Sequence, residues 1–195
     1  MRSPEEAEQI LAAELSRLEP RREALGAEGC FAVAGWTLQH ALEWEAALLA
    51  WRQVTAYKPR NVEAAYAEAL CLLEMSRFAD AAQRFRDVIE LDAETVGSGG
   101  EGLDWMEDDP EYRLGVALHA MGDLTAAIEA YERSASRNEI AVDALREICR
   151  ARIALGHAKE AIDAANRLER RAIRLTVRAE ALQFRAEARS LLRGS

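Results

Sequence analysis

Hydrophobic positions recur every three or four residues through most of the chain, which is the spacing of one face of an α-helix. In residues 112–135, however, several positions on the expected faces carry small residues: Gly115, Ala120, Ala127 and Ser134. Helix-forming runs lie on both sides of Gly122-Asp123, a dipeptide that favours a turn. Small residues where two helices cross allow their backbones to approach closely. The pattern therefore predicts an antiparallel pair of tightly packed helices.

The same pattern recurs after 34 residues, and an internal repeat of this length is informative about architecture. A shift of 34 carries one set of positions onto another: Gly115, Gly122, Ala127 and Tyr131 onto Cys149, Gly156, Ala161 and Ala165. The same shift relates an upstream set: Gly35, Trp44, Ala47 and Trp51 onto Ala69, Phe78, Ala81 and Phe85. The two pairs of repeats are offset by one repeat plus a 12-residue insertion.

The best repeat, LGVALHAMGDLTAAIEAYERSA, resembles the tetratricopeptide repeat, a helix-turn-helix unit of 34 residues. The first repeat ends VTAYKPRN, with Pro59 where that family places its closing proline. The resemblance implies an all-α fold, a right-handed α-solenoid of helix-turn-helix repeats with a capping helix at each end. The expected organisation is an N-terminal capping helix and linker (1–27), repeats one and two (28–61 and 62–95), an insertion (96–107), repeats three and four (108–141 and 142–175), and a C-terminal cap (176–195, helical over 176–193).

Three positions depart from the pattern of the family. Glu68 in repeat two, and Arg152 and Ala165 in repeat four, stand where large apolar residues are usual. We expect the fourth repeat to pack more loosely, or the Arg152 side chain to extend its charged end over a neighbouring helix.

Composition supports helices and excludes several classes of partner. Ala and Leu supply most of the apolar residues and Val-Ile-Thr alternation is nearly absent, so strands are not expected. The net charge of −9 is uneven: residues 1–140 carry 13 basic and 27 acidic side chains, and residues 141–195 carry 12 and 7. This acidic balance argues against a general nucleic-acid binder. Three separated cysteines and the lack of a signal sequence or spanning segment predict a cytoplasmic protein that is not inserted in a membrane.

The two non-repeat segments carry their own signals. Ser3-Pro4-Glu5-Glu6 has the residues of a capping box, and the run from Pro4 to Pro20 resembles the second helix of a repeat. The insertion, TVGSGGEGLDWMEDDP, combines flexible glycines with acids around Trp105 and Met106. The acids are expected to favour the start of the next helix, while Trp105 and Met106 are candidates for folding over a groove or contacting a partner.

Signatures of catalysis and metal binding are missing from the sequence. His40, His119 and His157 lie in separate repeats without ligands at metal-binding spacing. The sequence contains no HExxH, GxSxG or GK[ST] motif. We therefore expect a protein that is not an enzyme and that needs neither cofactor nor metal.

In the tetratricopeptide family the first helix of each repeat lines a concave groove that accepts a peptide or helix. Carried over position by position, the resemblance implies these groove residues: Trp36, His40, Tyr66, Leu70, Leu73, Tyr112, Arg113, Val116, His119, Arg146, Arg150, Ile153 and, on the last helix, Phe184. Such a groove would be aromatic and apolar at one end and cationic at the other. A protein-binding adaptor is the expected function, with a peptide or helical segment of a partner protein as its ligand.

Two alternatives stay open at this stage. Arg167, Arg170, Arg171 and Arg174 share one helical face if the helix continues, and this basic end could meet the acidic first half of another copy in a homo-oligomeric scaffold. The size and acidity also resemble secretion-type chaperones, which hold an aggregation-prone client.

Overall fold

A computed structural model describes residues 2–103, 109–137 and 142–194. The chain divides into two compact units, residues 1–104 and 105–195. The described residues form α-helices and one short 3-10 helix, and they contain no strand.

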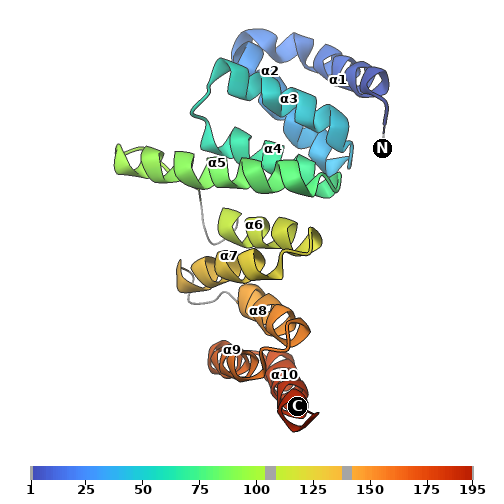
Figure 1. Ribbon diagram of the computed structural model, residues 1–195. Coiled ribbons are helices and arrows are strands. Elements are labelled where there is room, and N and C mark those ends of the chain that lie inside the picture. Colours follow the sequence, from blue (N-terminus) through green and yellow to red (C-terminus); the bar gives the residue numbers. More distant parts are fainter. Residues whose placement is uncertain (1, 104–108, 138–141, 195) are drawn as a thin grey trace. The chain divides into compact units, whose positions relative to one another are not determined.

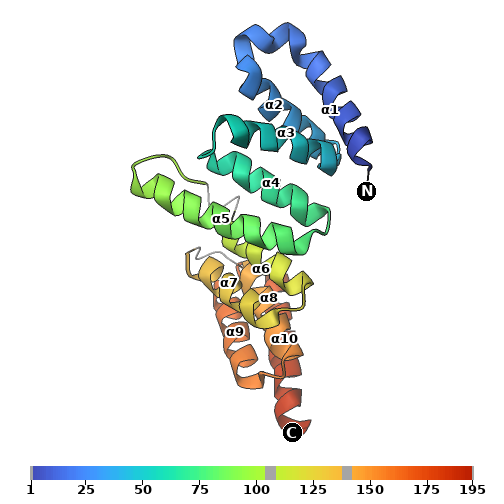
Figure 2. The same ribbon diagram turned by 45° about the horizontal axis from the view of Figure 1, so that its top comes forward.

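The first unit is a series of packed helices (Figures 1 and 2). Successive helices α2, α3, α4 and α5 lie side by side, and α1 packs against both α2 and α3. Their bounds are α1 Pro4–Leu18, a 3-10 turn Glu19–Arg21, α2 Arg22–His40, α3 Trp44–Tyr57, α4 Val62–Glu74 and α5 Phe78–Gly97.

The second unit repeats this arrangement (Figure 1). Each helix packs against the next along the chain, and α10 reaches back to α8 as well as α9. The bounds are α6 Pro110–Ala120, α7 Leu124–Arg137, α8 Val142–Ala154, α9 Ala158–Arg171 and α10 Leu175–Gly194.

Local chemistry sets several helix boundaries. Ser3 forms the expected capping box with Glu6, so α1 begins as its sequence predicts. Asn61 and Asp109 cap α4 and α6 by accepting hydrogen bonds from free backbone N–H groups of the first turn. In α2, Gly26 has a φ of 71° and interrupts the helical backbone.

The turns between paired helices share one backbone feature. Leu42, Ser76, Gly122 and Gly156 all have a positive φ, and within each unit the two positions are 34 residues apart. This left-handed conformation costs little for Gly but is unfavourable for Leu and Ser. Each helix pair therefore turns at an equivalent residue, although the chain uses Gly there only in the second unit.

Small residues lie where the helices of a pair come closest. A Cβ atom at Gly35 would lie 2.6 Å from Cε2 of Trp51, and one at Gly115 would lie 2.5 Å from Cδ1 of Tyr131. Both aromatic rings are buried. The small residue on the first helix therefore makes room for a large ring on the second, which accounts for the Gly and Ala positions in the hydrophobic pattern.

The segment after α5 turns back onto that helix. Asp92 is buried and its carboxylate accepts a hydrogen bond from the backbone N–H of Leu103 at 2.8 Å. A Cβ atom at Gly102 would lie 2.6 Å from Cγ2 of Val96, so the segment lies directly on α5. Trp105 and Met106, the predicted contact residues of this insertion, lie outside the described residues.

The three cysteines, Cys30, Cys71 and Cys149, are free and buried. Cys71 is in hydrogen-bond contact with the Gln39 amide, whose nitrogen lies 3.7 Å from its sulfur. They pack as small apolar residues, in agreement with the sequence interpretation.

Candidate partner-binding surfaces

The first unit exposes an aromatic pair on α2. Trp36 has 47% of its surface exposed and stacks on His40, with ring centroids 6.1 Å apart. Its edge meets the buried ring of Trp51 at 5.9 Å. The Trp51 indole N–H in turn donates to Oε1 of Gln39 at 3.0 Å. The exposed indole therefore sits on an ordered base and offers a rigid apolar contact.

The predicted groove residues of α4 are less accessible. Tyr66 is only 3% exposed and packs edge-on against the buried Phe85, with centroids 5.8 Å apart. Leu73 is also buried, and Leu70 is half-buried. In this structure Tyr66 and Leu73 therefore serve packing, because α4 buries most of its apolar surface.

In the second unit, α6 presents a row of half-buried side chains: Tyr112, Arg113, Val116 and His119. The Tyr112 ring packs against Tyr131 with centroids 5.7 Å apart, and the guanidinium carbon of Arg113 lies 5.9 Å from the centroid of the Tyr112 ring. A cation over an aromatic face is stabilised by the ring quadrupole.

The charges of two acidic residues of α8 act on Tyr112 of this row. Burial raises the pKa of Tyr112, and the negative charges of Asp143 and Glu147 raise it further.

The predicted arginines of α8 are held by acids. Arg146 donates from Nε to Glu180 of α10 at 2.8 Å and also pairs with Asp143, while Arg150 pairs with Glu147. The predicted cationic end is therefore charge-balanced, because acids three residues before each arginine share its helix face. Ile153 and Phe184 are half-buried on the same two helices, α8 and α10.

The basic segment at 167–174 does not form one face. Helix α9 ends at Arg171 and α10 begins at Leu175, so Arg174 belongs to neither helix. Arg171 donates from Nη1 to the Ala135 carbonyl at 2.9 Å, and Arg167 pairs with Glu132, whereas Arg170 and Arg174 are exposed. The expectation of a shared face fails because the helix ends before the fourth arginine.

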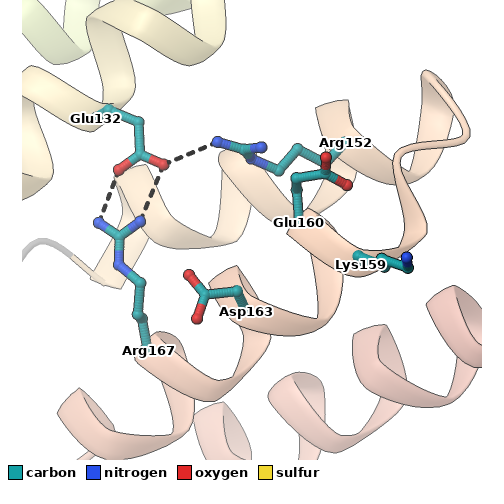
Figure 3. Close-up of a pocket in the computed structure, with 6 residues that line it drawn as sticks. All are labelled: Glu132, Arg152, Lys159, Glu160, Asp163 and Arg167. Carbon is teal, nitrogen blue, oxygen red and sulfur yellow. Dashed lines mark hydrogen bonds and ion pairs between the residues drawn. The ribbon is translucent and has the colours of Figure 1, made fainter.

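A charged depression of about 380 Å³ lies between α7, α8 and α9 (Figure 3). Glu132 lies between Arg152 and Arg167, with closest contacts of 3.2 and 2.7 Å. Burial alone would raise the pKa of Glu132, but the hydrogen bonds and charges of Arg167 and Arg152 outweigh it and lower the pKa. Lys159, Glu160 and Asp163 complete the lining.

This ion-pair group resolves one departure from the repeat pattern. Arg152 occupies a position that is usually apolar, and it extends toward Glu132 of the preceding helix. Glu68 in the first unit is paired in a similar way. Its carboxylate accepts a hydrogen bond from the Thr55 hydroxyl at 2.6 Å and forms an ion pair with Arg84 at 3.2 Å. Both departures are paired charges at helix contacts.

Two further features are missing from the described part of the chain. Within it, no group of three His, Cys, Asp or Glu side chains is placed to hold a metal ion. Among the same residues, no helix has both the length and the apolar character needed to cross a membrane.

No protein-family model matches the chain, and no curated protein matches it. Solved structures do match. A crystal structure of MamA protein has a TM-score of 0.64 at 18% identity, over 84% of this chain and 91% of that one. YrrB, described as a TPR protein with an unusual peptide-binding site, has a TM-score of 0.62 at 15% identity over 90% of both chains. PilF of Pseudomonas aeruginosa has a TM-score of 0.63 at 18% identity, over 97% of this chain and 90% of that one.

These similarities, at low identity, establish the fold. The chain is an all-α protein with the tetratricopeptide repeat fold, and the predicted fold class is confirmed. The MamA, YrrB and PilF structures are relatives in fold, and each is matched over nine-tenths or more of its own chain.

Proposed function

We propose that this chain is a non-enzymatic adaptor that binds a segment of a partner protein on the surface formed by α6, α8 and α10. The observation that carries the proposal is the row of half-buried Tyr112, Arg113, Val116 and His119 on α6, with the guanidinium of Arg113 over the ring of Tyr112. Aromatic and Arg side chains dominate the energetics of protein interfaces.

The chemistry of this surface defines the ligand. Val116, Ile153 and Phe184 offer half-exposed apolar contacts to an anchoring side chain of the partner. Arg150, whose side chain is 53% exposed, can exchange its internal partner Glu147 for a carboxylate of the ligand. An extended or helical segment with apolar anchors and a nearby acid fits this arrangement.

The exposed Trp36–His40 pair is a second contact point, on the first unit. The Trp36 indole supports this proposal because it is exposed to solvent and is also held in place by its contact with Trp51. The similarity to YrrB also favours peptide binding, since that protein's description names a peptide-binding site.

A displayed library of random peptides, selected against the full chain, would test the proposal. We expect an enriched peptide whose dissociation constant rises about tenfold or more in Tyr112→Ala and in Arg150→Glu, as is usual for central interface residues. Tyr57→Ala and Arg170→Glu, at exposed positions elsewhere, are the matched controls and should bind normally. Helicity of all variants is followed by circular dichroism.

Equal binding by all four variants would place the peptide elsewhere and remove the basis of this assignment. A chaperone role is the alternative. It requires that the chain keep an aggregation-prone client soluble, and Tyr112→Ala would leave that activity intact if the client binds elsewhere.

A further inference from the structure

The last helix, α10, has two apolar faces. Val177, Ala181 and Ala188 are buried where α10 packs on α8 and α9. On the opposite side Leu175, Ala179, Leu182 and Ala186 are exposed, at successive spacings of four, three and four residues. That spacing places them in one stripe along the helix. We call these four residues the outer stripe of α10.

The 34-residue repeat shows which positions of the preceding helices correspond to this stripe. A shift of 34 residues carries three buried residues of α8, Leu145, Ile148 and Cys149, and the half-buried Arg152, onto Ala179, Leu182, Gln183 and Ala186. Leu145, Ile148 and Cys149 are 0% exposed, whereas Leu182 is 47% exposed. On α6 the same face is covered by α7, since Tyr131 lies against Gly115. Three residues of the outer stripe, Ala179, Leu182 and Ala186, therefore correspond to positions on the face that the second helix of a pair covers in the preceding repeats.

The opposite end of the chain offers a helix of fitting chemistry. The exposed side of α1 carries Glu5, Gln9, Ala12 and Ser16 at the same spacings of four, three and four. Its small residues let another helix approach closely. The other side of α1 is occupied, because Ala7, Leu11 and Leu18 are buried where α1 packs on α2 and α3.

The charges of the two helices are complementary. Helix α10 carries four Arg and two Glu, and α1 carries four Glu and one Arg. Two copies of α10 facing each other would bring like charges together, whereas α10 facing α1 brings opposite charges together. The second copy's α1 is therefore favoured over its α10.

We propose that the outer stripe of α10 binds α1 of a second copy of this chain, so that the two helices complete one intermolecular helix pair. The contact is head-to-tail and leaves a free α1 and a free α10 at the two ends, so further copies can add. It does not depend on the proposed peptide surface, because Glu180 and Phe184 lie on a different side of α10 from the stripe.

Sedimentation velocity and light scattering across concentration test the contact. For the wild type we expect a mass that rises above the 21.6 kDa of one chain with concentration and falls with added salt. Leu182→Glu and Ala12→Glu should each weaken association about tenfold or more, since each introduces a charge into the helix contact. Met121→Glu, at an exposed apolar position that belongs to neither α1 nor α10, is the matched control and should associate as the wild type does.

A mixture gives the sharpest test. The Leu182→Glu chain keeps a normal α1 and the Ala12→Glu chain keeps a normal α10. Mixed in equal amounts, they should form a complex of two chains and nothing larger. A mass of one chain at every concentration and salt would overturn the proposal. So would association that Leu182→Glu abolishes and Ala12→Glu leaves unchanged, because the stripe would then bind something other than α1.

Discussion

At the scale of single residues, the closest helix contacts depend on a missing side chain. Gly35 and Gly115 lie against the buried rings of Trp51 and Tyr131, at distances where a Cβ atom does not fit. A glycine inside a helix is otherwise unfavourable by about 0.5–1 kcal/mol relative to alanine. The packing of the aromatic ring against the glycine backbone offsets this cost. Each glycine and the ring that packs on it therefore depend on one another.

Alanine at Gly115 should therefore lower stability. Its Cβ would lie 2.5 Å from Tyr131, and overpacking of this kind costs about 1–3 kcal/mol, more than the gain in helix propensity. Gly97→Ala is the control, because nothing lies within 4 Å of a Cβ there, and it should be neutral or stabilising. Urea unfolding of both variants measures the difference. A Gly115→Ala variant as stable as Gly97→Ala would mean that the ring moves freely.

At the scale of helices, paired charges hold contacts where the repeat pattern calls for apolar side chains. Glu132 joins α7 to α8 through Arg152 and to α9 through Arg167 (Figure 3). Each of the three side chains is less than one-third exposed. Removal of one charge from such a group leaves its partners poorly compensated.

Glu132→Gln should destabilise the second unit by about 1–3 kcal/mol at neutral pH, since two arginines lose a charged partner. The pKa of Glu132 is lowered in the folded state, so the unfolded state binds protons first as pH falls. The stabilisation is fully present above about pH 4.5 and is lost as pH drops through the lowered pKa.

Thermal unfolding from neutral to acid pH checks this. The variant should approach the wild type at low pH, while Glu129→Gln, at an exposed position of α7, should have little effect at any pH. A constant difference between Glu132→Gln and the wild type across the range would contradict the ion-pair account.

Much of the fold, and less of the surface, follows from the sequence. Small residues recur at the helix crossing, where Gly115 is followed 34 residues later by Cys149, and Gly122 recurs at the turn as Gly156. This recurrence predicts paired helices, because both the crossing and the turn constrain residue type. Tyr66 and Leu73 are buried although they lie at groove positions, since accessibility depends on how deeply neighbouring helices cover a face. Arg150 forms an ion pair with Glu147, three residues earlier on the same helix. A position-by-position comparison with a family does not show such a pairing, because it treats each residue alone.

The outer stripe of α10 could have been found in the sequence. Translation of Ile148 by one repeat gives Leu182, and this correspondence is the basis of the proposed intermolecular helix pair. A capping helix over residues 176–193 is expected to carry a polar outer side, and the exposed Leu182 is the residue that departs from this expectation.

At the scale of the whole molecule, the chain is two compact units with separate cores. Trp51 and Phe85 are among the largest buried side chains of the first, and Tyr131, Leu145 and Ile148 are among those of the second. Stability in repeat proteins comes mainly from contacts between neighbouring repeats, which both units contain within themselves.

Residues 1–104 and 105–195, produced separately, should therefore each fold. We expect each piece to give a helical circular dichroism spectrum and a cooperative thermal transition, because its own core stays intact. The full chain is the reference. A piece without a cooperative transition would show that its helices need the other unit.

The burial of the three native cysteines has a practical consequence for spectroscopy. Burial raises the pKa of Cys71 and of Cys149 to about 12, so almost none of either is thiolate at neutral pH, and Cys30 is buried as well. A cysteine placed at the exposed Gln53 or Ser136 would react with a maleimide dye far sooner. The unaltered chain is thus a ready background for energy-transfer measurements between a donor on one unit and an acceptor on the other.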